Sequence, residues 1–222
     1  MTEDHRDQRP PLSAAVLAGG KSSRMGTDKA LLSLTEGGPP IVETILARLA
    51  AIAEEVMIVG GTEPVYRRFG VRIVPDLRPG HAALGGIFTA ISSAAHEHTI
   101  VVACDMPFLS LPLLRRMANE PRDYDVLVPA TAGQSRQRND GLVYHTLHAI
   151  YGRACLPAIE RRLGAGRLQV VRILDDVVVR AMPVEEIVRW DPELRSFFNV
   201  NSPQTLAEAR AIAVGGERFA RP

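Results

Sequence analysis

The chain has 222 residues, of which 46% are hydrophobic and 23% charged, and its formal net charge at pH 7 is +1. This composition is ordinary for a globular protein with a substantial core, built as one α/β domain or as one domain with an elaborated C-terminal part. A net charge so near zero provides no overall field toward nucleic acid or a membrane. We therefore expect neither partner, and anion binding must come from local clusters.

The ends of the chain and its cysteines indicate in which cellular compartment the protein is expected. Residues 1–11 are charged and contain prolines but no apolar segment, which argues against a signal peptide, and no apolar run has the length of a membrane helix. Cys104 and Cys155 lie in no metal-type spacing and are expected to be small buried residues in a reducing cytosol. The sequence predicts a cytoplasmic protein with one domain at residues 12–213 and flexible ends, the second at 214–222.

Apolar runs of strand length alternate with amphipathic helical runs along the chain. Strands are predicted at Ser13–Leu17, Val56–Val59, Val71–Val74, Thr99–Ala103, Val126–Pro129, Val177–Ala181 and Phe197–Val200. Helices are predicted at Pro40–Ile52, Leu84–Ala95, Leu111–Met117, about His145–Leu163 and about Pro203–Ala213. Ser110 and Ser202 are suited to cap the third and the last of these helices. Strands separated by helices imply an α/β fold with a three-layer, mostly parallel, doubly wound (Rossmann-like) sheet.

The densest cluster of functional residue types follows the first predicted strand. Residues Leu17 to Ala30 read L-A-G-G-K-S-S-R-M-G-T-D-K-A, with three glycines, an arginine and two lysines. Glycines allow backbone N–H groups to approach an anion closely, and the cations neutralise it. The spacing fits neither a Walker A loop, which needs glycine at Ala15, nor G-x-G-x-x-G, because Gly19 and Gly20 are adjacent. A surface turn would need glycine but not these cations, so the loop indicates a site for the phosphates of a nucleoside triphosphate.

The loop resembles the signature loop of the nucleotidyltransferase superfamily, and its wording is most similar to the molybdenum cofactor guanylyltransferase family. Three later segments support the resemblance: Pro75-Asp76, Cys104-Asp105-Met106-Pro107 and Asn199-Val200-Asn201-Ser202-Pro203. The resemblance extends from Leu12 to Arg210. It implies a sheet of the nucleotidyltransferase type and transfer of GMP from GTP to the terminal phosphate of molybdopterin or Mo-molybdopterin, with release of pyrophosphate. It also implies an acceptor side from about residue 141 onward and transient contact with cofactor-delivery proteins.

Asp105 is the candidate metal ligand. It follows the predicted strand Thr99–Ala103, so we expect it at the same sheet edge as the loop. A single carboxylate beside a triphosphate is a usual ligand of Mg²⁺, which takes its other ligands from phosphate and water. Capping of the helix after Ser110 is the alternative, and the intervening Pro107 and Phe108 weaken it. The resemblance assigns Asp105 the metal and a nucleotide contact, and so makes Mg²⁺ the expected cofactor.

The resemblance also implies contacts with the nucleotide along the loop. Backbone groups facing the base would belong to Leu17, Ala18 and Gly19. Lys29 would contact the nucleotide, and Arg24 and Lys21 would hold the β- and γ-phosphates, Arg24 more strongly because a guanidinium binds in bidentate fashion. The alternative for these side chains, above all for Lys21, is a solvated loop. Arg24, Lys29 and Asp105 are therefore the candidate catalytic residues.

Three further polar residues follow predicted strands. Asp76 offers acceptors for the N1–H and N2–H₂ donors of guanine, and its alternative role is that of a turn residue after Pro75. Asn199 and Asn201 alternate on a predicted strand and so share one face, either toward the second substrate or the metal, as the resemblance implies, or as caps of the final helix. Three histidines without metal-ligand spacing are expected as surface or turn residues: His81, His145 and His148.

The chain departs from the family pattern at three places. Ala82-Ala83 stand where relatives commonly carry Gly-Pro, Gly60-Gly61 where a polar side chain often faces the base, and Tyr144-His145-Thr146 where a proline usually precedes the next apolar segment. The first two bear on base specificity and the third on the pterin side. Two alternatives stay open: a cytidylyl- or sugar-phosphate nucleotidyltransferase, and a nucleotide-binding regulator without turnover. Asp28-Lys29-Ala30 favours the guanylyl branch, and an intact metal carboxylate favours an enzyme.

Overall fold

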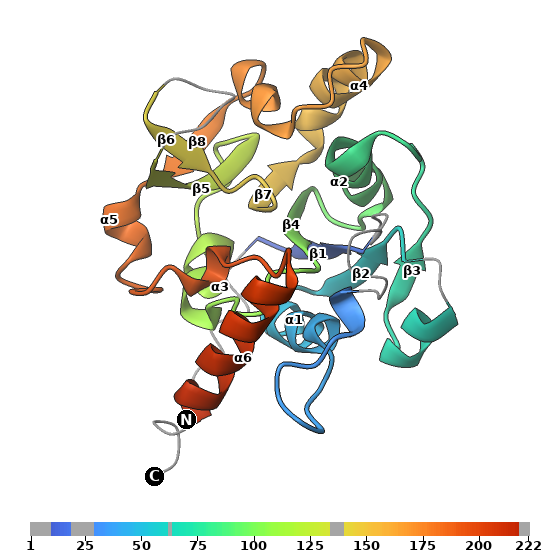
Figure 1. Ribbon diagram of the computed structural model, residues 1–222. Coiled ribbons are helices and arrows are strands. Elements are labelled where there is room, and N and C mark those ends of the chain that lie inside the picture. The colour runs from blue at the N-terminus through green and yellow to red at the C-terminus, as the bar shows by residue number, and fades with distance from the viewer. Residues whose placement is uncertain (1–9, 19–28, 62–63, 134–139, 218–222) are drawn as a thin grey trace, which may run out of the picture.

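The computed structural model describes residues 10–18, 29–61, 64–133 and 140–217. Its strands are β1 (Leu12–Leu17), β2 (Glu55–Val59), β3 (Arg72–Val74), β4 (His98–Ala103), β5 (Val126–Ala132), β6 (Leu142–Tyr144), β7 (His148–Gly152) and β8 (Val179–Met182). Its α-helices are α1 (Ile41–Ala50), α2 (Ala82–Ser93), α3 (Leu111–Ala118), α4 (Leu156–Gly164), α5 (Val184–Ile187) and α6 (Pro203–Glu217). Its 3-10 helices are η2 (Lys29–Leu31), η3 (Pro64–Phe69), η4 (Arg153–Cys155), η5 (Val170–Asp175) and η6 (Arg195–Phe197). The strands form one sheet in the order β3-β2-β1-β4-β7-β5-β6, with β8 paired to β5 (Figure 1).

The first four strands form the parallel half of the sheet. β1 lies between β2 and β4 and pairs in parallel with both, so that Leu17 is opposite Val59 on one side and Ala103 on the other. β3 continues this direction beside β2. The chain leaves β1 toward β2 and returns from β3 through α2 to β4, so the topological switch point lies between β1 and β4. Open α/β sheets bind their ligands at this point, beyond the carboxyl ends of the strands.

Two predicted elements differ from the structure, and β6 and α5 were not predicted. The predicted helix over about His145–Leu163 is wrong in its first half: β7 is a strand that pairs antiparallel with β4 and β5, and only α4 is helical. All five residues of β7 are buried, and periodicity alone does not distinguish a short, fully apolar strand from a buried helical turn. The predicted strand Phe197–Val200 is also wrong, because η6 ends at its first residue and no strand follows. The predicted Val177–Ala181 strand is present as β8.

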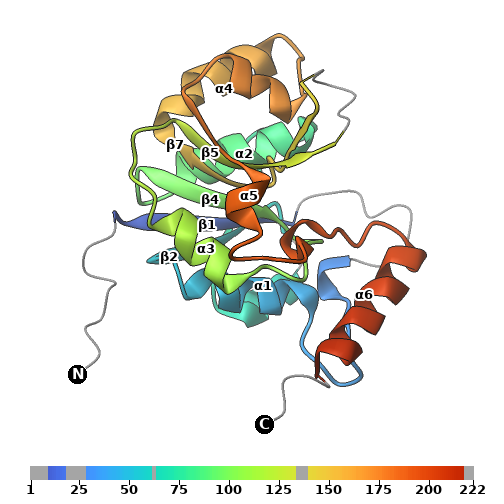
Figure 2. The same ribbon diagram turned by 90° about the vertical axis from the view of Figure 1, so that its left-hand side faces the viewer.

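Helices cover both faces of the sheet, which confirms the expected three-layer, doubly wound architecture. Figure 2 shows α2 and α4 on one face and α1 and α3 on the other. The residues of β1 alternate between the two layers: Ala14 and Val16 belong to the apolar cluster with α1 and α3, and Ala15 and Leu17 to the cluster with α2 and α4. This alternation follows from the two-residue period of a strand, and it explains why β1 is buried along its whole length.

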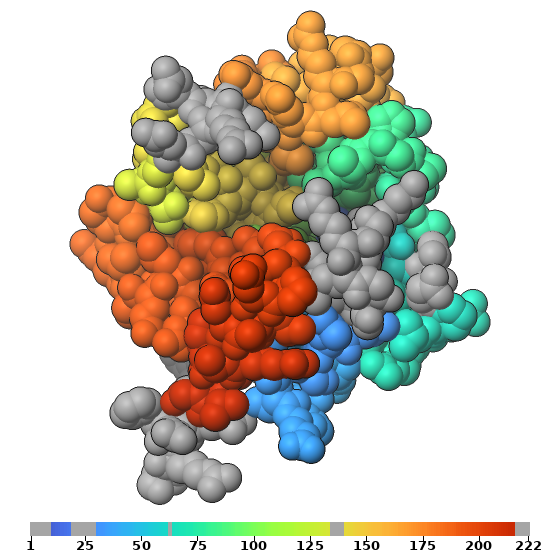
Figure 3. Space-filling view, viewed as in Figure 1, coloured from blue at the N-terminus to red at the C-terminus, as the bar shows by residue number. Residues whose placement is uncertain are grey.

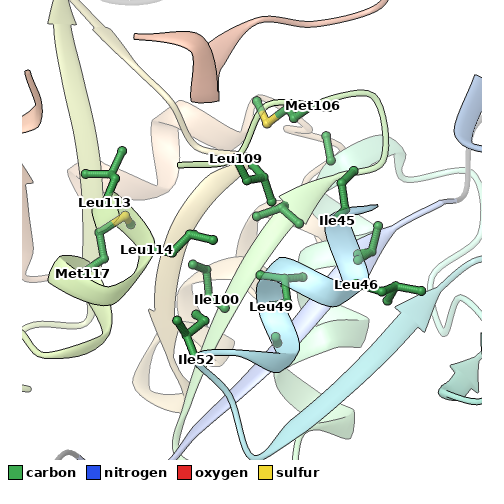
Figure 4. Packing of buried hydrophobic residues seen from close by; sticks show 14 of the residues in the cluster. Ile45, Leu46, Leu49, Ile52, Ile100, Met106, Leu109, Leu113, Leu114 and Met117 are labelled. Atoms are coloured by element: carbon green, nitrogen blue, oxygen red, sulfur yellow. The ribbon is translucent and has the colours of Figure 1, made fainter. Parts of the chain in front are cut away.

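The loop after β4 is anchored in the first of these clusters. Met106 and Leu109 are 4% and 3% exposed, and they pack near α1 and α3 (Figure 4). Burial of such a side chain contributes roughly 1.5–3 kcal/mol. The backbone on both sides of Asp105 is therefore fixed by the core on one side and by β4 on the other.

Helix caps confirm two of the predicted boundaries. Leu113 N–H donates to Ser110 Oγ at 3.3 Å, and Thr205 N–H donates to Ser202 Oγ at 3.1 Å. α6 runs to Glu217 rather than ending near Ala213. Figure 3 shows this red C-terminal helix beside blue atoms of the segment that leads into α1. Within the described ranges, no helix combines the length and the apolar character needed to cross a membrane.

Ala82 begins α2 in a left-handed backbone conformation, with φ +49°. A Cβ in this region costs about 1–2 kcal/mol, whereas glycine adopts this conformation freely. Replacing Ala82 with glycine removes this cost. It also gives the unfolded chain more conformational freedom, which offsets about 0.4–1 kcal/mol of the stabilisation. We expect Ala82→Gly to raise the free energy of unfolding in urea by up to about 1 kcal/mol. The matched variant Ala83→Gly, at a position without positive φ, should lower it, and a shift of both variants in one direction would contradict the prediction.

Candidate active site

The carboxyl ends of the parallel strands bring the candidate residues to one edge of the sheet. Leu17 ends β1, and Asp76 and Asp105 each lie two residues beyond the ends of β3 and β4. The strand ladder continues past these ends: Ala18 N–H donates to Val59 O at 2.9 Å, and Cys104 N–H donates to Leu17 O at 3.2 Å. The start of the loop and the start of the Asp105 segment are thus directly hydrogen-bonded.

The middle of the loop lies outside the described residues, and with it the candidates Gly19, Lys21 and Arg24. The loop re-enters the described part at Lys29, the first residue of η2. Its neighbour Ala30 is fully buried in the cluster that contains α1. Both ends of the loop are therefore held by the core, one through β1 and the other through Ala30.

Asp105 is half-buried, and its backbone carbonyl accepts a hydrogen bond from Val200 N–H at 2.9 Å. The preceding Cys104 is also only half-buried, whereas Cys155 is fully buried, and both are free cysteines. Burial raises the pKa of the Cys155 thiol to about 12, and this thiol donates to Asp125 O at 3.2 Å. The expectation of two buried cysteines is confirmed for Cys155 and wrong for Cys104, because Cys104 follows the last buried residue of β4.

Asp76 stabilises the turn after β3. Its Oδ1 accepts a hydrogen bond from Arg78 N–H at 2.9 Å and lies 2.9 Å from the Thr89 hydroxyl of α2. The turn role predicted as the alternative is therefore present. A carboxylate has a second oxygen, so recognition of a base by the same side chain stays a prediction.

A segment before α6 crosses the loop that carries Asp105. We call residues 190–200 the strap; Figure 2 shows it as red ribbon between α5 and α6, beside α3. Ser110 fixes its first half, because the Ser110 hydroxyl donates to Trp190 O at 2.7 Å and Ser110 N–H donates to Ser196 Oγ at 2.8 Å. The Val200 N–H bond to Asp105 fixes its second half.

The strap also has internal hydrogen bonds. The buried carboxylate of Asp191 accepts from Arg195 N–H at 3.2 Å and from Ser196 N–H at 2.8 Å. Asn199 Nδ2 donates to Phe197 O at 3.0 Å, so its amide turns back onto η6. Asn199 and Asn201 therefore lie on either side of the residue bonded to Asp105, but not on a strand. The prediction that strand alternation places them on one face is wrong.

Two of the three histidines lie in an aromatic cluster with Phe197. The His145 ring stacks on Phe197 with centroids 3.7 Å apart, and His148 meets the same ring edge-on at 5.3 Å. His148 is fully buried, and among the described residues neither of its ring nitrogens has a hydrogen-bond partner. Desolvation lowers the pKa of His145 to about 4, and desolvation together with the charge of His145 lowers that of His148 to about 3. The surface or turn assignment is confirmed for His81 and for His145, which lies in a turn, and is wrong for His148.

A pocket of about 880 Å³ opens beside this edge, between the start of α2, the turn before β7 and η5. Three arginines line it: Arg162, Arg167 and Arg172. Arg162 pairs with Asp176 at 2.6 Å and Arg172 with Asp175 at 3.5 Å. The turn is joined to the strand that carries Asp105, because Ala103 N–H donates to Leu147 O at 3.1 Å.

Sequence reasoning missed the strap contacts, the aromatic cluster and the pocket arginines. The adjacent Phe197-Phe198 pair just before Asn199 was an available signal, because two neighbouring phenylalanines in a polar segment need packing partners to avoid exposure to water. Phe198 finds one in Phe108, with ring centroids 5.8 Å apart. The arginines of the pocket carried no such signal, since arginines on helices and in loops are usually solvated.

Comparison with known proteins agrees with this geometry. The family model for the MobA-like NTP transferase domain matches residues 14–178. A probable molybdenum cofactor guanylyltransferase of Pelotomaculum thermopropionicum is 38% identical, over 90% of this chain and 93% of its own length. Another, of Natranaerobius thermophilus, is 30% identical, over 90% of this chain and 95% of its own length.

Solved structures show the same fold. Molybdopterin-guanine dinucleotide biosynthesis protein A of Archaeoglobus fulgidus superposes with a TM-score of 0.76 at 27% identity, over 91% of this chain and 99% of its own. A 4-diphosphocytidyl-2C-methyl-D-erythritol synthase of Anaerococcus prevotii, at 14% identity and a TM-score of 0.66, covers 92% of this chain and 96% of its own and shares the fold alone. The family match spans more than half of the chain, which therefore belongs to the MobA-like NTP transferase family and is a nucleotidyltransferase.

Proposed function

We propose that this protein transfers GMP from GTP to the terminal phosphate of molybdopterin or Mo-molybdopterin, releasing pyrophosphate and forming the guanine dinucleotide form of the molybdenum cofactor. The observation that carries the proposal is the hydrogen bond between Cys104 N–H and Leu17 O, which joins the start of the nucleotide loop to the segment of Asp105. The names of the relatives support the choice of guanine and of the pterin acceptor. We further propose that the enzyme works in the cytoplasm, where free cysteines persist.

The residues at this edge fit Mg²⁺ as the cofactor. Among the described residues, no group of three or more His, Cys, Asp or Glu side chains could hold a metal ion. Mg²⁺ needs no such group, because it is commonly held by one or two carboxylates together with phosphate oxygens and water. Asp105 would be that carboxylate. Mg²⁺ bound there would neutralise negative charge on the triphosphate.

The chain's own residues position the two substrates. A terminal phosphate oxygen of the acceptor attacks the α-phosphorus of GTP, the bond from that phosphorus to the bridging oxygen breaks, and pyrophosphate leaves. The attacking phosphate has a second pKa near 6, so it is mostly dianionic at neutral pH and needs no general base. Arg24 and Lys21 would hold the β- and γ-phosphates, and Lys29 would contact the nucleotide. Backbone groups of Leu17, Ala18 and Gly19 would face the base. Catalysis then consists of orientation and charge neutralisation.

The pocket beside the edge suits the acceptor. Leu147, Leu168 and Val171 offer apolar surface for a flat ring system, and Arg167 and Arg172 offer positive charge for an anionic group. Asn199, on the strap, and Asn201, just after it, are the two neighbours of Val200, whose N–H donates to Asp105 O. Transient contact with cofactor-delivery proteins remains a prediction.

Thermal unfolding with GTP, CTP, ATP or UTP, each with and without Mg²⁺, tests the nucleotide side. A ligand stabilises the folded state by mass action, so a tenfold preference for GTP corresponds to about 1.4 kcal/mol. We expect GTP with Mg²⁺ to stabilise the protein most. Asp76→Ala should reduce the advantage of GTP over CTP about tenfold, because the free carboxylate oxygen would no longer accept from guanine. A preference for CTP would support the cytidylyl alternative, and no dependence on Mg²⁺ would support the regulator.

Transfer itself is tested by pyrophosphate release. The rate with GTP and Mg²⁺ should depend on added molybdopterin, and the product should be the guanine dinucleotide. Two results would contradict the proposal: pyrophosphate release that does not depend on molybdopterin, and no pyrophosphate release at all.

A further inference from the structure

The turn before β7 lies between the pocket and the strap. Thr146 and Leu147 line the pocket, whereas the adjacent His145 faces Phe197 of the strap. Two hydrogen bonds make the turn rigid: the buried Tyr151 hydroxyl donates to Thr146 O at 2.6 Å, and His145 N–H donates to Pro129 O at 2.9 Å. A rigid turn that contacts both the pocket and the strap can fix the position of the strap relative to the pocket.

The His145 ring is the element of the turn that reaches the strap. Its plane lies 16° from that of Phe197, and its Nε2 lies 2.9 Å from Thr131 Oγ1 of β5. Phe197 also contacts His148, with the two rings nearly perpendicular. The contact with β5 therefore fixes the position of the imidazole, and the imidazole in turn fixes the position of the strap.

The stack acts directly on the segment beside Asp105. Phe197 O accepts from the Asn199 amide, and two residues later Val200 N–H donates to Asp105 O. A displacement of the Phe197 ring would move Asn199 and strain the Val200 bond. The other strap anchors, Ser110 and Asp191, hold its first half and would remain.

We infer that His145 is a positioning residue: by stacking on Phe197 it places the Asn199–Asn201 segment for binding of the phosphorylated pterin acceptor. The inference rests on the proposed function. We expect the effect of His145 to fall on the acceptor side, because Phe197 O is bonded to the Asn199 amide, whereas the two ends of the nucleotide loop are fixed by the pairing of β1 with β2 and β4 and by the fully buried Ala30.

The kinetic test compares His145→Ala with His145→Phe in the full chain. We expect His145→Ala to raise the KM for molybdopterin three- to tenfold and to leave the KM for GTP within twofold, as loss of one aromatic pair implies. His145→Phe keeps the stack without the Thr131 contact and should restore the KM for molybdopterin to within twofold of wild type. His96→Ala, at the opposite edge of the sheet, is the matched control and should change neither constant.

Hydrogen exchange at the Val200 amide tests the same inference without substrate. In His145→Ala this amide should exchange faster than in wild type, while amides of the β1–β2 ladder keep their rates. If the wild-type protein forms no dinucleotide with molybdopterin, the proposed function fails. Hydrogen exchange then still tests whether His145 positions the strap. Unchanged Val200 exchange would overturn the inference. A rise of both KM values together, or faster exchange throughout the sheet, would also overturn it, because the role of His145 would then be general stability.

Discussion

Replacement of Asp105 with alanine is expected to lower kcat for pyrophosphate release by about 10²–10³-fold, because loss of one preorganised charge contact raises the barrier by roughly 3–4 kcal/mol. The fold should survive. Met106 and Leu109 anchor the segment in the core, and the bond from Val200 N–H uses the backbone of Asp105 rather than its side chain. The measurement is the initial rate at saturating GTP, molybdopterin and Mg²⁺, with urea unfolding as the check on stability.

Two further variants make this result specific. Asp123→Asn changes an exposed carboxylate that precedes β5, at the opposite edge of the sheet, and should keep the wild-type rate. Lys21→Ala should have a milder effect than Asp105→Ala, since a lysine is a weaker clamp than the nearby Arg24. Rates of Asp105→Ala comparable to wild type at saturating Mg²⁺ would exclude Asp105 as the metal ligand.

The parallel half of the sheet was predictable because each of its strands carries its own local signal. β1 after Ser13 and β4 after Thr99 are uninterrupted apolar runs, as expected of strands covered on both faces, and a glycine or proline follows β2 and β3. The rule that ligands bind beyond the carboxyl ends of such strands then placed Asp76 and Asp105 at one edge. This part of the site depends only on the strands being parallel. A sequence in which strands alternate with helices predicts parallel strands.

The acceptor side was not predictable in the same way. β7 follows no helix, and its antiparallel pairing with β4 depends on residues far away in the chain, so its buried run was indistinguishable from a helix. Apart from the short 3-10 helix η6, the strap has no regular structure. It is held by contacts of Ser110 and Phe197 with distant partners and by hydrogen bonds of Asp191 within the strap. No spacing rule links such residues. His148 illustrates the difference, since a histidine on its own favours neither the surface nor a fully buried strand.

The stability of the protein is expected to fall steeply as the pH decreases from 6.5 toward 4, because two histidines are held neutral in the fold. The pKa of His148 is lowered to about 3 by desolvation and by the charge of His145, and desolvation lowers that of His145 to about 4. In the unfolded chain both titrate near 6.5. The unfolded state therefore binds more protons in this window, so the stability is full above pH 6.5 and is lost as the pH falls.

The size of the effect is set by His148, which is fully buried. At pH 5 it should reduce the free energy of unfolding by about 2 kcal/mol relative to pH 7, and His145, partly open to solvent, should add a smaller amount. In His148→Leu the new side chain has a similar volume, and the part of the pH dependence that comes from His148 is removed. It should also stabilise the protein by about 1 kcal/mol at pH 7, since the described residues give the buried ring nitrogens no partner.

Urea unfolding of wild type and His148→Leu at pH 7 and pH 5 measures the difference, and His96→Gln, a histidine without such burial, is the control. We expect the advantage of His148→Leu to grow by about 2 kcal/mol between the two pH values, while carboxylates shared by both proteins cancel. The control should follow wild type. An advantage of His148→Leu that is the same at both pH values would mean that His148 is protonated in the folded state near pH 5, and that the aromatic cluster around Phe197 admits a charge.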